Sequence, residues 1–125
     1  AYEFGAGDWS ADGCSSDLAN ENLCGIWVAD SNAIEIGYIV ICFGYSIEFG
    51  GRDAFVDELY IEETYRGRGF GRELLAMALQ EARACDVQAL HLEVAKSNNR
   101  AARFYRSLGF LARSKYQLMS CDLSS

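Results

Sequence analysis

The six residues Arg66-Gly67-Arg68-Gly69-Phe70-Gly71 separate an apolar, strand-like segment from a helical run. Because Gly69 and Gly71 have no side chains, the backbone there can approach an oxyanion closely and point successive N–H groups at it. The helix that follows adds unpaired amides and the positive end of its dipole. Arg66, Arg68 and Arg72 supply permanent charge that pairs well with phosphate. The stretch predicts a strand-to-helix turn that binds a phosphorylated ligand, with a pyrophosphate as the best fit.

Two nucleotide-binding patterns with glycine-rich turns do not fit this stretch. A P-loop ends in Gly-Lys-Ser/Thr, whereas Gly71 is followed by Arg72 and Glu73. A dinucleotide-binding turn places its third glycine three residues after the second, whereas these glycines recur at every second residue. Taken alone, the turn would also fit a flexible connection or a nucleic-acid contact, so other parts of the chain must decide its role.

The composition limits the class of protein. A chain of 125 residues that is 50% hydrophobic can bury one core, which predicts a single domain. No apolar run reaches the roughly 18 residues that span a bilayer, and no signal-like segment opens the chain. The net charge of −7 disfavours a nucleic-acid partner and favours a cationic one. The five cysteines are odd in number and lack metal-ligand spacing, so we expect reduced thiols, a cytoplasmic location, no metal and no membrane partner.

The first 18 residues differ from the rest of the chain. The stretch from Gly7 to Leu18 shows neither helical nor strand periodicity. We therefore expect residues 1–18 to be a non-native or disordered leader, followed by one domain over residues 19–125.

The remaining pattern predicts a mixed α/β fold, in the order of two antiparallel strands, a third strand, a helix, a strand, a helix and a last strand. The alternation of polar and apolar residues also predicts that only one of Asp57 and Glu58 can face solvent, and that His91 and Glu93 share a strand face. A short helix follows Ser97 or Asn98, which would cap it, and Gly109 ends it. The predicted strands and the longer helix are Cys24–Ala29, Ile34–Tyr45, Ala54–Ile61, Phe70–Ala84 (helix), Ala89–Ala95 and Tyr116–Leu123.

Two motifs on these elements resemble those of the Gcn5-related N-acetyltransferase (GNAT) superfamily. The acyl-CoA signature of that family is Arg/Gln-x-x-Gly-x-Gly/Ala, met here by Arg66, Gly69 and Gly71. A second pattern, Asn-x-x-Ala-x-x-x-Tyr followed by Leu-Gly-Phe, is met from Asn98 to Phe110. The resemblance covers roughly residues 24–123 and identifies the chain as similar to an N-terminally truncated member, without the usual first strand and helices.

The resemblance implies a central mixed sheet, flanked by helices, whose fourth and fifth strands splay apart and hold acyl-CoA between them. Those strands are residues 54–61 and 89–95 here, and acetyl-CoA would be the cosubstrate. Its pantetheine would run along one strand and its pyrophosphate would meet the glycine-rich turn. The implied CoA-binding residues are Leu59, Tyr60, Ile61, Arg66, Gly67, Arg68, Gly69, Phe70, Gly71, Arg72, Asn98, Ala101 and Tyr105.

The resemblance also implies direct attack of an amine on the thioester in a ternary complex. A primary amine has a pKa of about 10.4, so freeing its lone pair at pH 7 costs roughly 4 to 5 kcal/mol, and a base is useful. Glu93 is the first candidate, because its twelve-residue spacing to Tyr105 is similar to that of ribosomal-protein alanine acetyltransferases. Glu58 is the second, because Asp57-Glu58 is similar to the acidic pair of diamine acetyltransferases. A solvated strand residue is the alternative for either carboxylate.

Tyr105 is the candidate general acid toward the departing CoA thiolate. A thiol of pKa about 8.5 is a stronger acid than a phenol of about 10, so full proton transfer from tyrosine is uphill by roughly 2 kcal/mol. Tyr105 would then act mainly by hydrogen bonding to developing negative charge. A core tyrosine is the alternative.

The leading function is an N-acetyltransferase, an acyltransferase for groups other than aminoacyl groups, that acts on a small-molecule or peptide amine. A non-catalytic acyl-CoA-binding module and, within the enzyme class, a protein N-terminal acetyltransferase stay as alternatives. An RNA-binding domain fits poorly with the net acidity. Association as a homodimer stays open.

Overall fold

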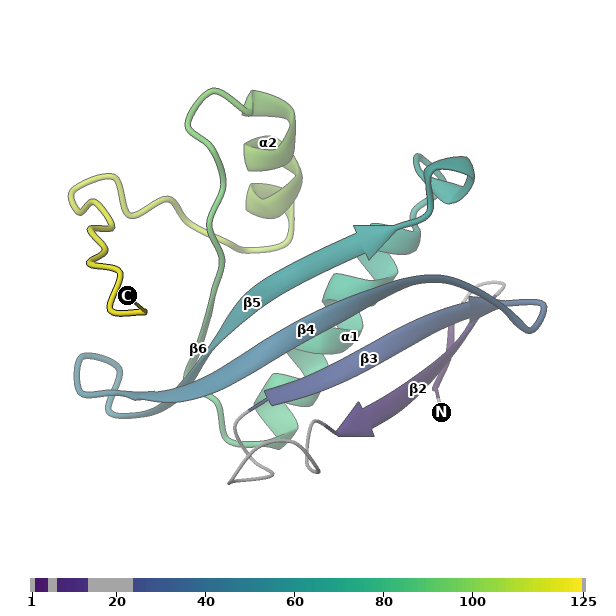
Figure 1. Ribbon diagram of the computed structural model, residues 1–125, viewed down its shortest axis with the longest axis horizontal. Coiled ribbons are helices and arrows are strands. Elements are labelled where there is room, and N and C mark those ends of the chain that lie inside the picture. Colours follow the sequence, from purple (N-terminus) through teal and green to yellow (C-terminus); the bar gives the residue numbers. More distant parts are fainter. Residues whose placement is uncertain (1, 5–6, 14–23, 125) are drawn as a thin grey trace. The chain divides into compact units, whose positions relative to one another are not determined.

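The structure, a computed structural model, describes residues 2–4, 7–13 and 24–124. The chain divides into two compact units, residues 1–93 and residues 94–125. All the strands of the described residues and the longer helix α1 belong to the first unit, and the short helix α2 belongs to the second (Figure 1).

The first unit is built on a six-stranded sheet in which the spatial order of the strands follows the sequence. Neighbouring strands pair antiparallel until the last pair, where β6 runs parallel to β5. The parallel step requires a crossover, which α1 supplies. The strands are β1 (Tyr2–Phe4), β2 (Gly7–Gly13), β3 (Cys24–Ser31), β4 (Ile34–Ser46), β5 (Gly51–Ile61) and β6 (Ala89–His91).

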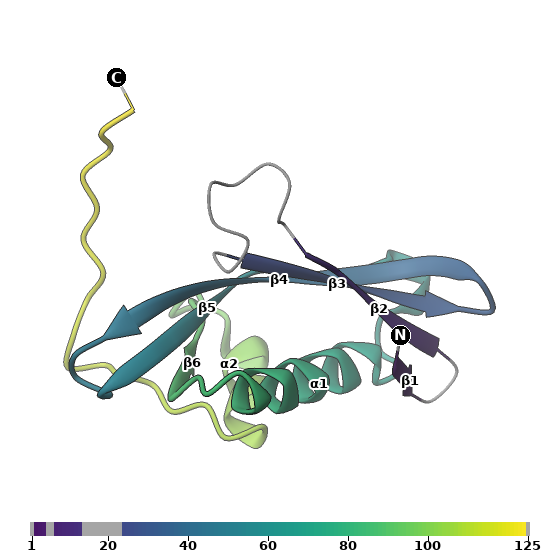
Figure 2. The ribbon, with the colours of Figure 1, turned by 90° about the horizontal axis from the view of Figure 1, so that it is seen from below.

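Helix α1 (Phe70–Ala84) lies against one face of this sheet, over β4 and β5 (Figure 2). Its apolar residues recur every three to four positions, so they form one stripe that can be buried. Leu74 and Leu75 are fully buried, as are Ile39 and Ile41 of β4. Directly paired residues of neighbouring strands share a face, so Trp27, Ile39 and Leu59 point to the α1 side of the sheet.

The predicted hairpin, third strand and long helix are confirmed, and the mixed α/β class with them. The predicted strand Ala89–Ala95 is wrong in its second half, because β6 ends at His91. The pairing register stops at Phe55 with His91, although β5 continues to Ile61. Residues 92–95 keep an alternating pattern but lose the hydrogen-bonded ladder that defines a strand. The early end of pairing confirms that these two strands splay apart.

The second unit contains α2 (Asn99–Ser107). Gly109 follows the helix with a φ of 101°, the left-handed conformation that ends helices. The predicted strand Tyr116–Leu123 is wrong, because no strand occurs in the described residues 112–124. A strand requires a partner that completes its ladder, and apolar composition does not supply one. The side chains of Met119 and Leu123 are 85% and 87% exposed.

The N-terminal strands overturn part of the expectation for the leader. Gly7–Gly13 pairs with β3 along its whole length, so the absence of regular structure predicted from Gly7 is wrong for these residues. Pairing supplies the backbone bonds whatever the side-chain pattern. Residues 14–18 lie outside the described part of the chain. The non-native origin of residues 1–18, and the single domain over residues 19–125, stay predictions.

Candidate active site

The N-terminus of α1 has the backbone geometry expected of an anion cradle. Gly69 is the N-cap and has a φ of 88°, and Gly67 has a φ of 77°, so both occupy the left-handed region that favours glycine. No side chain caps the helix, whose first hydrogen bond runs from the Glu73 N–H to the Gly69 carbonyl at 3.1 Å. The amides of the first turn therefore lie outside the helical ladder and point away from it.

The space in front of these glycines is open. A Cβ atom built on Gly67, Gly69 or Gly71 would meet no other atom within 4 Å. Gly67 and Gly69 are required by their positive φ, but nothing in the fold around Gly71 requires a glycine. A methyl group at this position would occupy the open side of the turn, where the sequence predicts that a phosphorylated ligand approaches.

Arg66 links the cradle to the end of β5. Its Nε donates a hydrogen bond of 2.7 Å to the carbonyl of Ile61, and its guanidinium lies 5.5 Å from the ring centre of Tyr60. This bond uses Nε and leaves the two terminal amino groups of the guanidinium out of it. Arg68 lies 5.3 Å from the ring of Tyr65. Both arginines are exposed, so their charge is available to an anion at the turn.

Beyond Phe55, the edge of β5 no longer pairs with β6, so some of its main-chain groups have no partner in that strand. The N–H of Glu62 donates to the carbonyl of Ile36 in β4, and bonding direction alternates along a strand. Tyr60 therefore bonds toward β4, whereas Leu59 and Ile61 direct their main-chain groups away from it. Of the three residues expected to bind pantetheine, Leu59 and Ile61 have the required orientation.

A bulge in β5 changes the direction of the side chains of Asp57 and Glu58. Val40 is opposite Glu58 and Ile41 is opposite Val56, so Asp57 is the extra residue of the strand. A bulge interrupts the alternation of side chains. Asp57 and Glu58 are accordingly both exposed, and the prediction that only one of them faces solvent is wrong.

Glu58 is held by a residue that the sequence motifs did not indicate. The hydroxyl of Tyr38 donates a hydrogen bond of 2.6 Å to Glu58 Oε1, and the Tyr38 and Tyr60 rings lie 5.7 Å apart. That hydrogen bond, followed by desolvation and the negative charge of Glu58, raises the pKa of Tyr38 above its usual value. Glu58 and Tyr38 lie on the sheet face opposite α1, because their partners alternate with Ile39 and Ile41.

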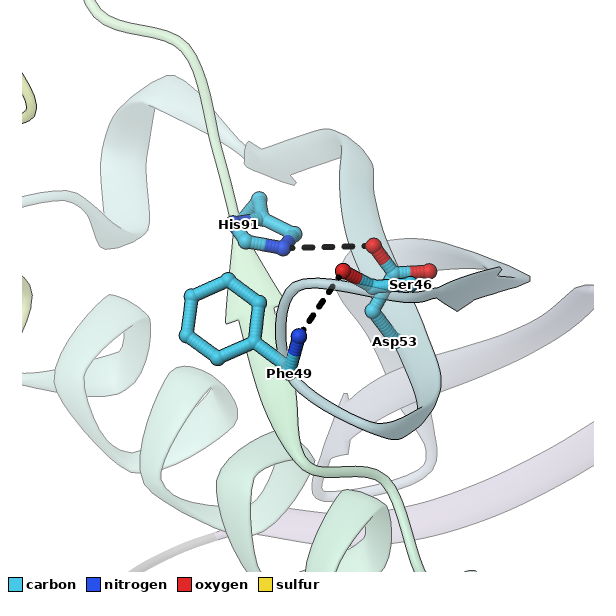
Figure 3. Close-up of polar contacts among 4 residues, drawn as sticks. All are labelled: Ser46, Phe49, Asp53 and His91. Carbon is cyan, nitrogen blue, oxygen red and sulfur yellow. Dashed lines mark hydrogen bonds and ion pairs between the residues drawn. The ribbon is translucent and has the colours of Figure 1, made fainter.

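His91 is the last residue of β6, and Glu93 lies two residues further along the chain in different surroundings. Glu93 is exposed and lies beyond the end of the strand, so the expected shared face with His91 stays a prediction. His91 Nε2 lies 3.3 Å from Asp53 Oδ2 (Figure 3). No motif or spacing connects these two residues, which are far apart in the chain.

Asn98, Ala101 and Tyr105 lie in the second unit. Asn98 Oδ1 accepts a hydrogen bond of 3.1 Å from the Ala101 N–H, which makes it the cap of α2. Tyr105 packs edge-on against Phe110 at 6.0 Å. Burial raises the pKa of the Tyr105 hydroxyl. A phenol with a raised pKa gives up its proton less readily, so full proton transfer from Tyr105 is less favourable than from an exposed tyrosine.

The described residues thus bring the cradle, the β5 edge and Glu58 together within one unit. Asn98, Ala101 and Tyr105 form a second group in the other unit. Within the described ranges, no cluster of three or more His, Cys, Asp or Glu side chains could hold a metal ion. In the same ranges, no helix has the length and apolarity needed to cross a bilayer.

Comparison with known proteins identifies the relatives of this site. The sequence pattern of the acetyltransferase (GNAT) family matches residues 4–110. Thialysine N-epsilon-acetyltransferase of Bos taurus is 31% identical over 74 residues, which cover 59% of this chain and 43% of the relative. L-methionine sulfoximine/L-methionine sulfone acetyltransferase of Salmonella typhimurium is 30% identical over 86 residues, which cover 68% of this chain and 49% of the relative. The chain therefore spans less than half the length of either protein.

A solved structure shares the fold of this chain. Integron cassette protein HFX_CASS3, from the mobile metagenome of Cole Harbour Salt Marsh, superposes with a TM-score of 0.74 at 29% identity. The match covers 86% of this chain and 65% of that one.

Proposed function

The chain belongs to the acetyltransferase (GNAT) family, and on that premise we propose that it transfers an acetyl group from acetyl-CoA to a primary amine. The observation that carries the proposal is the uncapped N-terminus of α1, beside the β5 edge from which β6 has separated. At Gly71 the fold has room for a side chain, but such a side chain would collide with a pyrophosphate bound at the turn. Arg66 and Arg68 complement the charge of that pyrophosphate.

In this proposal, the main-chain groups of Leu59 and the N–H of Ile61 bind the pantetheine, because the Ile61 carbonyl already accepts from Arg66. The residues from Arg66 to Arg72 bind the pyrophosphate. Asn98 and Ala101 already bond to each other, so any part that they play in CoA binding stays a prediction. Amine attack forms the C–N bond as the C–S bond breaks. Tyr105 stabilises the negative charge that develops on sulfur.

The groups proposed to bind the amine that receives the acetyl group are carboxylates. Glu58, held by Tyr38, and the exposed Glu93 are the proposed groups that attract the ammonium form of the substrate and take up a proton from it. The names of the relatives suggest a small amine or amino acid as the acceptor, and a peptide N-terminus is the second choice. A cytoplasmic location and a homodimer, expected from the sequence, stay predictions.

Calorimetric titration with acetyl-CoA, followed by an assay for release of CoA thiol, tests the proposal. The amines assayed are thialysine, a diamine, methionine sulfoximine and a short peptide with a free N-terminus, and the N-acetylated form of each is the matched control. We expect micromolar binding and thiol release with at least one free amine. Binding without release would favour the non-catalytic acyl-CoA-binding module, and absence of binding would refute the proposed function.

A further inference from the structure

His91 and Asp53 form a partly buried pair that the proposed reaction does not yet use. Nε2 of the imidazole lies 3.3 Å from Oδ2 of the carboxylate, and the two side chains are 18% and 16% exposed (Figure 3). The rings of Phe49 and Phe55 flank the imidazole at centroid distances of 5.5 Å and 5.0 Å. The imidazole is thus shielded from most of the solvent but still accessible.

The pair lies where the two splayed strands separate. Phe55 and His91 are the last paired residues of β5 and β6, and the bulge at Asp57 follows on β5. The register places His91 on the same sheet face as Phe55 and Glu58, opposite α1. The partners of Phe55 and Glu58 on β4, Cys42 and Val40, are two steps of about 3.3 Å apart, because the bulge adds Asp57 without an extra step. The levels of the imidazole and this carboxylate are therefore on the order of 7 Å apart along the strand.

The chemistry of the proposed reaction requires two proton transfers from nitrogen. A protonated primary amine loses one proton to expose its lone pair and a second as the C–N bond forms. The sulfur that leaves when the C–S bond breaks takes up one proton as CoA thiol. The other proton passes to solvent, so the site needs an accepting group before the attack as well as one after it.

We propose that His91, oriented by Asp53, accepts the first proton from the acceptor amine in place of a direct transfer to Glu58 or Glu93, and returns it to solvent. Neutral imidazole has one donor and one acceptor nitrogen. When Nε2–H points at the Asp53 carboxylate, the lone pair of Nδ1 becomes the acceptor, which is how a carboxylate selects a histidine tautomer. Glu58 holds the ammonium group nearby. This inference rests on the proposed acetyl transfer.

His91 is the only histidine in the chain, so its ring signals can be followed directly by NMR. We expect acetyl-CoA to shift the ring nitrogen resonances. The nucleotide part of CoA, which lacks the pantetheine and the acetyl group, fills only the cradle and should shift them much less. Unchanged ring signals at saturating acetyl-CoA, with binding verified by calorimetry, would overturn the proposal.

Kinetics of two histidine variants give the second test. His91→Ala should lower kcat on the order of 100-fold or more with little change in the KM for acetyl-CoA, and added imidazole should restore part of the rate. His91→Gln, which keeps more of the side-chain volume, should be as slow without being rescued. An unaltered kcat in folded variants contradicts the proposal, as does a loss in His91→Ala that imidazole does not relieve.

Asp53→Asn tests the positioning role of the carboxylate. It should lower kcat less than His91→Ala, leave the KM for acetyl-CoA unchanged and alter the ring nitrogen shifts that report the tautomer. Asp86→Asn, an exposed carboxyl outside the site, is the matched control and should change none of these quantities. An active wild-type chain with full activity in His91→Ala would refute only this inference. A wild-type chain that binds acetyl-CoA but acetylates no amine would refute the proposed function and the inference together.

Discussion

Helices α1 and α2 begin in opposite ways. The N-cap of α1 is Gly69, which has no side chain to give, whereas α2 begins at Asn98, whose Oδ1 bonds to the Ala101 N–H at 3.1 Å. Helix α1 is held in place by a buried apolar face that includes Leu74 and Leu75, whereas no residue of α2 is buried. A helix anchored by its packing can leave its first amides open to a ligand, but a short, exposed helix needs its own cap.

This difference distinguishes candidate binding groups in the backbone of α1 from a candidate catalytic side chain in α2. In the proposed reaction the cradle at α1 binds CoA through backbone amides, so substitutions there should change ligand affinity. The candidate in α2 is the side chain of Tyr105, so its substitution should change the rate. The following predictions test that division.

Gly69→Val should have the largest effect. A β-branched residue is strained at a φ of 88° and would turn the amides away from the ligand. We expect acetyl-CoA to bind at least 100-fold more weakly, which corresponds to about 3 kcal/mol. Calorimetry measures the affinity, and circular dichroism checks that α1 is still formed. Unchanged affinity would remove the cradle from the site.

Tyr105→Phe should lower kcat about 10- to 100-fold, or roughly 1.4 to 2.8 kcal/mol, and leave the affinity for acetyl-CoA nearly unchanged. The reason is that the hydroxyl acts on charge that develops only in the transition state. Steady-state kinetics give kcat, and calorimetry gives the affinity. If the rate is retained, Tyr105 has a packing role only.

Gly71→Ala separates ligand binding from folding. The new methyl group meets no protein atom, and alanine favours a helix over glycine, so the free energy of unfolding should rise by up to about 1 kcal/mol. The affinity for acetyl-CoA should nevertheless fall about tenfold, or 1.4 kcal/mol. Denaturant titration and calorimetry on the same sample measure the two changes. A fall in both stability and affinity would indicate a structural role for this glycine.

Asn98→Ala should have the smallest effect. Loss of the cap destabilises the start of α2 by about 1 kcal/mol. Amide hydrogen exchange of residues 99–102 should become faster, while exchange in α1 stays the same. Asn98→Asp, which retains the capping oxygen, is the matched control. Loss of acetyl-CoA affinity in the alanine variant alone would show that the cap is required for binding.

Much of the first unit could be predicted from local pattern. The 3.6-residue spacing of Leu74, Leu75 and Ala78 predicted α1 to its observed ends. The predicted strand Tyr116–Leu123 failed because an exposed apolar segment has the composition of a strand without a pairing partner. The pattern also missed the bulge at Asp57, because a bulge depends on the register between two strands.

The sequence by itself determined the cradle and the cap of α2, because both depend on neighbouring residues: Gly67 and Gly69 permit the left-handed backbone, and Asn98 reaches an amide three residues away. Only the tertiary structure decided which side chains meet across strands. The Tyr38 bond to Glu58 and the approach of His91 to Asp53 each join residues at least 20 positions apart. Such contacts depend on strand register and on where β6 leaves β5, and both follow from the packing of the whole sheet rather than from any local pattern.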